Sequence, residues 1–219
     1  MKCLNVDFKA RLRTLQPLRL CLALLRHLED LELCLVGLSH SSWARLLRSL
    51  HFESLQNLST NAPHSVLCHF LSGAKNMQHL RLLSYCGNIC QLENFAPPYL
   101  TDVTAATACV VPFISHARVE RLSIIDLGPE DSVAFSQMLR SLAPSGPALT
   151  TLHIDFNPGD RDILRRISEV APNLTALKLV EKSSVPQVCE PFFHVTASHS
   201  LTYTSGPFSS PAPSLEQCY

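Results

Sequence analysis

The sequence has little charge and no excess of either sign. Lys and Arg together number 18, and Asp and Glu also number 18, so the formal net charge is zero at pH 7. Proteins that bind nucleic acid through its phosphates usually carry a basic excess or a basic stripe. Arg11 and Arg13 are the only hint of one, and an exposed helix face explains them equally well. We therefore expect no nucleic-acid partner.

Long hydrophobic runs are also missing. A helix needs about 20 apolar residues to cross a bilayer, and the most apolar stretch, Val103–Ile114, is shorter than that and contains Pro112. In residues 1–15, charged side chains such as Asp7 and Lys9 interrupt any signal-peptide core. The sequence therefore predicts no membrane partner and a cytoplasmic or nuclear location.

Glycine is scarce as well. The chain has only seven glycines, and they form no glycine-rich loop of the kind that cradles a phosphate group. The Gly-Pro pair at residues 128–129 and the Pro-Gly pair at residues 158–159 are explained by turns. We expect no cofactor.

Cysteine is present, but not in the order of a metal site. The nine cysteines are scattered, and none forms a C-x-x-C pair. His64, Cys68 and His69 are close in sequence, as are Cys86 and Cys90. A zinc site needs about four ligands, and these residues lack a matching second pair. We interpret them as reduced thiols and histidines of loops and core, and predict no metal.

Apolar side chains, by contrast, are abundant. Hydrophobic residues make up 46% of the 219 residues and charged residues 16%, which is the opposite of the balance in disordered chains. There is enough material for a packed core in one large domain or two small ones.

An apolar block of the form Φ-x-x-Φ-x-Φ recurs along the chain, where Φ is apolar and the middle Φ is here called the anchor. Successive anchors are 27, 22, 23, 19, 30, 25 and 24 residues apart; they are Leu31, Leu58, Leu80, Val103, Leu122, Leu152, Leu177 and Leu201. Leu4 and Val6 have the spacing of one more, incomplete copy. Leucine-rich repeats have periods of roughly 20–29 residues, so the pattern indicates a repeat of that type.

The residues beside the anchors are polar. Among the 24 positions that lie one or two residues before an anchor or one residue after it, only Ala176 is apolar, although 46% of the chain is hydrophobic. Such alternation with a period of two predicts short strands that have one buried face and one solvent-exposed face.

Segments with helical spacing lie between these strands. They are Ser42–Leu50, with Ser41 or Ser42 as the N-cap, and Asp131–Leu142 and Asp160–Val170, each with its Asp as the cap. The residues expected on their buried faces are Trp43, Leu46, Leu47, Leu50, Phe135, Met138, Leu139, Leu142, Ile163, Leu164, Ile167 and Val170. Pro172 is expected to end the last helix, because proline cannot continue it.

Together these patterns predict an irregular, leucine-rich-repeat-like α/β solenoid with parallel strands on the concave face and helices on the convex face. One strand and one helix cannot bury their leucines alone, so neighbouring units must stack. We expect this solenoid of seven or eight repeats over residues 1–204. The Pro- and Ser-rich tail, residues 205–219, is expected to be disordered.

Three repeat segments, ARVERLSI, GPALTTLHI and APNLTALKL, resemble the leucine-rich-repeat region of fungal F-box-type proteins, and the resemblance covers most of residues 20–204. It implies that the repeats receive the substrate of a cullin-type ubiquitin ligase, to which an F-box would attach them. We find no F-box before the first repeat, because the residues before Leu28 suffice for only one helix. A scaffold protein without a ligase link is the alternative.

The expected function is recognition of a protein partner through the concave strand face. Mixed charges on one ribbon suit specific polar recognition. By alternation, the outward residues expected to contact the partner include Asp30, Glu32, His79, Arg81, Arg121, Ser123, Thr151, His153, Asp155 and Lys178.

His153 and Asp155 also raise the hypothesis of an enzyme. They lie two residues apart and therefore on one face of a strand, and a histidine near a carboxylate can act as a base. The sequence specifies no nucleophile beside them, and exposed strand residues of a solenoid usually contact solvent or a partner. We therefore predict a protein that is not an enzyme and has no catalytic residues.

Overall fold

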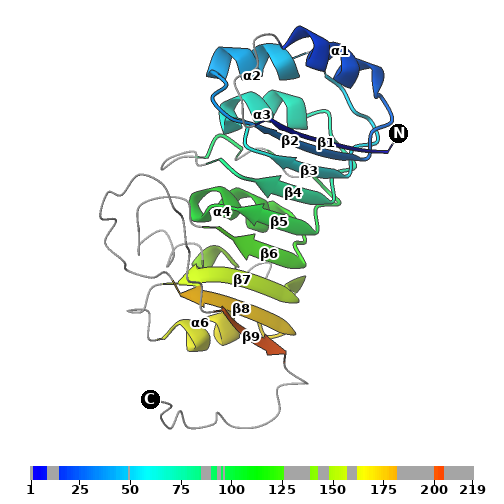
Figure 1. The fold of residues 1–219 in the computed structure, drawn as a ribbon. Coiled ribbons are helices and arrows are strands. Elements are labelled where there is room, and N and C mark those ends of the chain that lie inside the picture. Colours follow the sequence, from blue (N-terminus) through cyan, green and yellow to red (C-terminus); the bar gives the residue numbers. More distant parts are fainter. Residues whose placement is uncertain are drawn as a thin grey trace, which may run out of the picture.

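The computed structural model describes residues 2–8, 15–48, 50–84, 90–92, 95, 97–125, 139–142, 148–156, 162–181 and 200–204. The chain is a mixed α/β protein built on one open sheet (Figure 1). The strands are β1 (Cys3–Phe8), β2 (Asp30–Leu35), β3 (Asn57–Thr60), β4 (His79–Leu82), β5 (Asp102–Ala105), β6 (Arg121–Ile124), β7 (Thr151–Phe156), β8 (Ala176–Glu181) and β9 (Ser200–Thr204). The helices are α1 (Gln16–Leu24), α2 (His40–Leu47), α3 (His64–Leu71), α4 (Thr107–His116) and α6 (Ile163–Val170).

The strands follow one another across the sheet in the order of the sequence, from β1 at one edge to β9 at the other. Strands β1 to β8 are parallel, and β9 is antiparallel to β8. Each parallel strand pairs only with its sequence neighbours, so the connection after it must return to the same end of the sheet.

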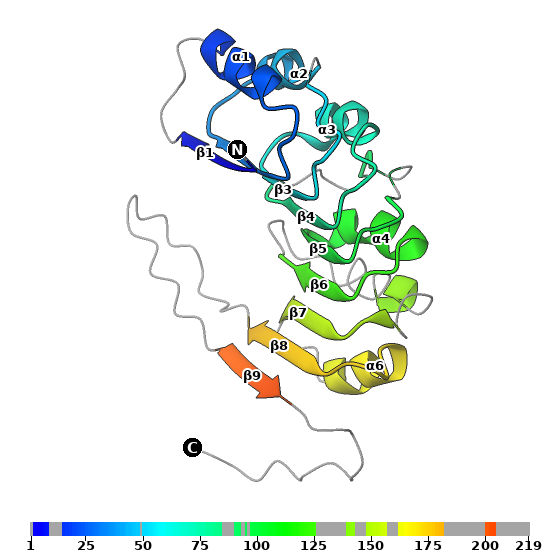
Figure 2. The same cartoon turned by 90° about the vertical axis from the view of Figure 1, so that its right-hand side faces the viewer.

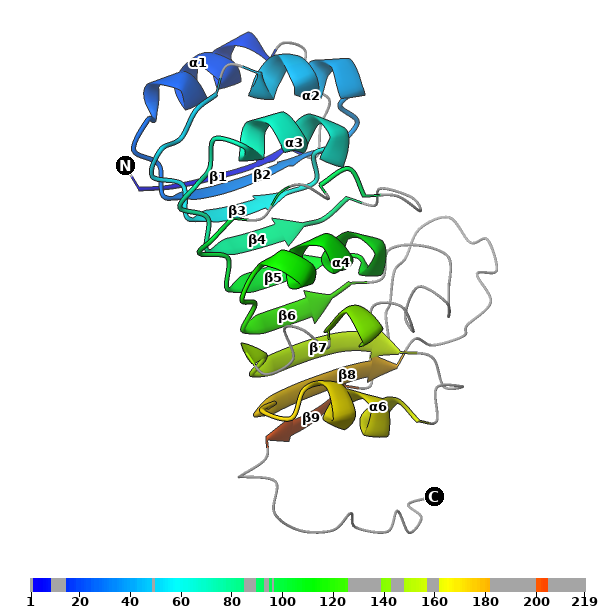
Figure 3. The same ribbon diagram turned by 180° about the vertical axis from the view of Figure 1, so that it is seen from behind.

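The five described helices lie on one face of the sheet, as Figures 2 and 3 show from two sides. The sheet bends so that its strand face is concave and the helices are on the outside (Figure 2). None of the described helices is both long and apolar enough to span a membrane.

The anchors predicted from the sequence pair with one another in a single row. Leu31 lies opposite Leu58, Leu58 opposite Leu80, and the row continues through Val103, Leu122 and Leu152 to Leu177. The expected extra copy is also present, because Leu4 pairs with Leu31 and Val6 with Leu33. From Leu31 to Leu152 every anchor is buried, and Leu177 is partly buried. The predicted register of these strands is confirmed.

A repeated backbone contact holds the beginning of each strand. The carbonyl oxygen of Glu29 accepts hydrogen bonds from the amides of both Gln56 and Asn57, at 2.8 and 2.9 Å. The carbonyl oxygens of Lys2, Gln56, Gln78, Thr101, Glu120 and Thr150 each accept the same pair of bonds from the next strand. Because both amide donors belong to the backbone, the contact tolerates variable side chains at these positions. The hydroxyls of Thr101, Thr150 and Thr175 also donate to the carbonyl oxygens that their units contact.

Two polar residues of the β3 unit are held by the unit before it. Thr60 occupies a position that is leucine in the neighbouring strands, and its buried hydroxyl donates to the carbonyl oxygen of Leu33 at 2.9 Å. The side chain of Asn61 accepts from the amide of Leu35 and donates to its carbonyl oxygen, at 2.9 and 3.2 Å. These bonds satisfy the polar groups that the core would otherwise leave unpaired.

The eighth anchor does not follow the prediction. The sequence places Leu201 opposite Leu177, but β9 runs antiparallel and Leu201 lies opposite Leu179. A hydrophobic pattern with a period of two is the same in both directions along a strand, so it cannot distinguish parallel from antiparallel pairing. The expectation of parallel strands throughout is wrong for β9.

The helices predicted at residues 42–50 and 160–170 are present as α2 and α6, but α2 ends at Leu47 rather than at Leu50. The cap of α2 is Ser39, whose hydroxyl accepts from the amide of Ser42, so the helix begins earlier than expected. The predicted buried residues Trp43, Leu46, Leu47 and Leu50 are buried.

In α6, Ile163 and Ile167 are buried as expected, but Leu164 is 55% exposed, which contradicts the prediction. The helix ends at Val170, before Pro172, and its N-cap residue is Asp162, which makes no side-chain capping bond. In the predicted helix 131–142, Leu139 and Leu142 are buried, and Phe135 and Met138 lie outside the described residues. Residues 205–219 also lie outside them.

Replacing one anchor should destabilise the whole chain. Leu122 is 1% exposed and lies between Val103 and Leu152 in the sheet. We expect Leu122→Ala to lower the free energy of unfolding by about 3 kcal/mol, because it removes buried methyl groups and leaves a cavity. Leu164→Ala is the matched control, and its effect should stay below about 0.5 kcal/mol. Urea denaturation of both variants measures this, and equal losses would contradict the assigned burial.

Candidate functional site

Two rows of side chains cross the concave strand face. In parallel strands that pair in register, residues two apart along a strand share a face, so each row collects one position from every strand. The first row is Cys3, Asp30, Asn57, His79, Asp102, Arg121, Thr151 and Ala176; the second row is Asn5, Glu32, Ser59, Arg81, Thr104, Ser123, His153 and Lys178.

The structure brings the predicted partner-contacting residues together. Asp155 lies farther along β7, and the others lie in the two rows; these are Asp30, Glu32, His79, Arg81, Arg121, Ser123, Thr151, His153 and Lys178. Arg81, Arg121 and Lys178 are exposed, and the rest are half-buried. Polar residues that the prediction did not name, such as Asn57 and Asp102, belong to the same surface.

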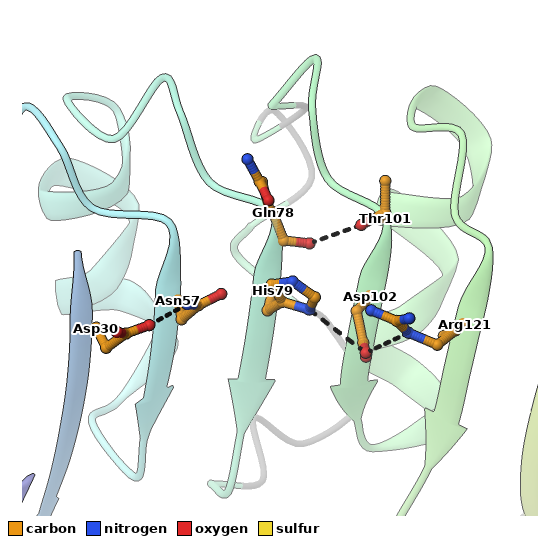
Figure 4. Close-up of polar contacts among 7 residues, drawn as sticks. All are labelled: Asp30, Asn57, Gln78, His79, Thr101, Asp102 and Arg121. Carbon is orange, nitrogen blue, oxygen red and sulfur yellow. Dashed lines mark hydrogen bonds and ion pairs between the residues drawn. The ribbon is translucent and has the colours of Figure 1, made fainter. Parts of the chain in front are cut away.

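Asp102 is the centre of the first row. Its carboxylate Oδ2 lies 3.4 Å from Nδ1 of His79 and accepts a hydrogen bond from Nε of Arg121 at 2.9 Å (Figure 4). Asn57 donates to the carboxylate of Asp30 in the same row. Asp102 was recognisable in the sequence as one of the polar residues that precede an anchor, but its two partners follow only from the register.

In the second row, the hydroxyl of Ser123 lies 3.1 Å from Nδ1 of His153. The other ring nitrogen, Nε2, is shielded from solvent and has no hydrogen-bond partner among the described residues. Burial lowers the pKa of His153 from its ordinary 6.5, the positive charge of Lys178 lowers it further, and Asp155 acts in the opposite direction. His153 is therefore neutral at neutral pH.

The structure places the hydroxyl of Ser123 beside His153, but no described carboxylate accepts a hydrogen bond from the histidine ring. In a catalytic triad, one ring nitrogen contacts the nucleophile and the other donates to a carboxylate. Here Ser123 contacts Nδ1 of His153, and Nε2 makes no hydrogen bond to Asp155 or to any other described residue. Ser123 and His153 therefore form a polar contact within the second row, without the third member of a triad among the described residues.

A separate cluster of donor atoms lies in the helix layer. His64 is the first residue of α3, Cys109 is in the first turn of α4, and Cys90 is in the connection between β4 and β5. Nδ1 of His64 lies 3.4 Å from Sγ of Cys90 and 3.5 Å from Sγ of Cys109. All three side chains are buried, and their donor atoms lie within 4.8 Å of one another.

The cluster strongly favours a thiolate at Cys90. The pKa of Cys90 is lowered from 9.0 to about 4; a hydrogen bond from the thiol of Cys109 is the largest cause, and burial acts in the opposite direction. Hydrogen bonds from His64 and from the backbone of Leu92, together with the charge of His64, also lower this pKa.

The sequence did not reveal this cluster. From the sequence we grouped His64 with Cys68 and His69 and predicted no metal ligands, but the cluster includes neither Cys68 nor His69. We grouped Cys90 with Cys86, which lies outside the described residues. Cys109 was not considered, because it lies 45 residues from His64 and has no spacing motif.

No family model matches this sequence, and no curated protein is similar to it at a significant level.

The lowered pKa of His153 predicts a loss of stability in acid. A histidine whose pKa is lower in the folded chain than in the unfolded chain stabilises the fold fully above about pH 6.5, and this stability is lost as the pH falls through the folded pKa. We expect His153→Gln, which cannot be protonated, to lose less thermal stability than the wild type between about pH 7.5 and pH 5. Melting curves across this range measure the difference, and parallel curves would contradict the prediction.

Proposed function

We propose that the chain is a leucine-rich-repeat-like solenoid that recognises a protein partner through the two rows on its concave strand face. The observation that carries the proposal is the continuity of these rows across eight parallel strands, on the face opposite all the described helices. A curved strand ribbon of this kind presents many side chains to one extended ligand.

Two regular features support the interpretation as a repeat, because a parallel sheet of this size can form without either of them. The anchors pair in one unbroken row from Leu4 to Leu177. The bifurcated backbone contact before each strand also recurs from unit to unit. Each unit therefore contacts the next through the same backbone groups, as the units of stacked repeats do.

The exposed charges on this face favour an acidic segment as the ligand. Arg81, Arg121 and Lys178 stand exposed on β4, β6 and β8. At about 4.8 Å between strands, they extend over roughly 19 Å. Asp102 pairs with Arg121, whereas Asp30 and Glu32 lie towards the other edge, on β2. From β4 to β8 the three cations stand against Asp102 and Asp155, so a small positive excess remains, which suits carboxylates on a partner.

Reversing the charge of the cations should weaken capture of the partner. We expect the double variant Arg81→Glu, Lys178→Glu to reduce partner affinity at least about 10-fold, because each change replaces attraction with repulsion. Arg45→Glu on α2 is the matched control, because Arg45 is exposed in a helix of the opposite face. Quantitative affinity capture from the source cell, with circular dichroism to verify folding, measures the effect.

The proposal is contradicted if every protein captured by the wild type is retained equally by the folded double variant. The same experiment separates the two roles that share this surface. A cullin-type ligase subunit that co-purifies with the chain supports the ligase-adaptor role, and a partner set without one supports a scaffold.

A further inference from the structure

We propose that Nδ1 of His64, Sγ of Cys90 and Sγ of Cys109 bind one zinc ion. This site is separate from the strand face, and the proposal does not depend on protein recognition.

The distances between the donor atoms are those of a zinc site. Zinc binds histidine nitrogen at about 2.0–2.1 Å and thiolate sulfur at about 2.3 Å, so tetrahedral angles place the nitrogen and each sulfur about 3.5 Å apart. The observed separations from Nδ1 of His64 are 3.4 Å to Cys90 and 3.5 Å to Cys109. The sulfurs lie within 4.8 Å of each other, and a tetrahedral site needs about 3.8 Å. Only a small adjustment is needed to admit the ion.

The charge of the cluster selects a divalent ion. Cys90 is 3% exposed, Cys109 is 0% exposed and His64 is 3% exposed, so a net charge here would be costly. Two thiolates and a neutral imidazole balance the charge of a divalent cation, whereas a monovalent copper ion would leave one negative charge. Thiolate and imidazole together are also the ligand set that zinc prefers, in contrast to the oxygen ligands of magnesium and calcium.

The positions of the ligands indicate what the ion would do. His64 follows β3, Cys90 follows β4 and Cys109 follows β5, so one ion would join three successive connections of the chain. His64 and Cys109 lie in the first turns of α3 and α4, where the helix dipoles favour the negative charge of the thiolates. The three ligands leave a fourth coordination position for a water molecule or another donor. We assign the ion a structural role because it would join three successive connections within the core.

Zinc content and cobalt substitution test the site directly. The full chain is purified under reducing conditions, reconstituted with zinc, freed of excess metal and analysed by atomic emission. We expect about one zinc per chain. Replacement by Co²⁺ should give thiolate-to-cobalt charge-transfer absorption, together with the strong visible bands of a tetrahedral site. Zinc at a hundredfold excess over its Kd should raise the melting temperature by roughly 5–10 °C.

Matched variants locate the ligands. Cys90→Ala, Cys109→Ala and His64→Ala should each weaken zinc binding more than about 100-fold, because each removes one of three protein ligands. Cys68→Ala is the control, since Cys68 is a half-buried cysteine of α3 outside the cluster and its loss should leave zinc binding unchanged. If a ligand variant does not fold, the metal content and cobalt spectrum of the wild type still decide the question.

Three outcomes would overturn the proposal. The first is a reconstituted wild type that holds no zinc. The second is equal loss of zinc in Cys68→Ala and in the ligand variants. The third is a disulfide between Cys90 and Cys109 in a second preparation made without reductant, seen by mass spectrometry of unreduced peptides, because a disulfide removes both thiolates.

Discussion

The pairing of each strand with the next in one register is the constraint on which the rest of this structure depends. The row of anchors from Leu4 to Leu177 can be buried only if no strand slips. A slip of one residue would turn every side chain of that strand to the other face. The same register that buries the leucines therefore also aligns the polar residues between them into continuous rows on the opposite face.

The two candidate sites use different layers of this arrangement. The strand rows lie on the concave face and take one position from each strand, with acidic side chains on β2 and exposed cations on β4, β6 and β8. The cluster of His64, Cys90 and Cys109 lies in the helix layer, where three connections meet. A ligand on the strand face and a buried ion in the helix layer would lie on opposite sides of the sheet, and each would contact several successive units at once.

Much of the fold could be predicted because its signals are local. The alternation around Leu122 or Leu152 lies within one strand, and the spacing of Trp43 and Leu46 lies within one helix. The errors occur where a local pattern fits two arrangements. The strand containing Leu201 has the same alternation in either direction, and Leu164 lies at the edge of an apolar helical stripe, where packing alone decides burial.

The sequence by itself determined which residues form strands, which face of each strand is buried and therefore which side chains line the concave face, because these depend on periods of two and 3.6 residues. Only the tertiary structure decided that Asp102 lies between His79 and Arg121, and that β9 is antiparallel. It alone also joined Cys109 to His64 across 45 residues. Contacts between units depend on how connections of unequal length pack, and no repeated spacing in the sequence records that.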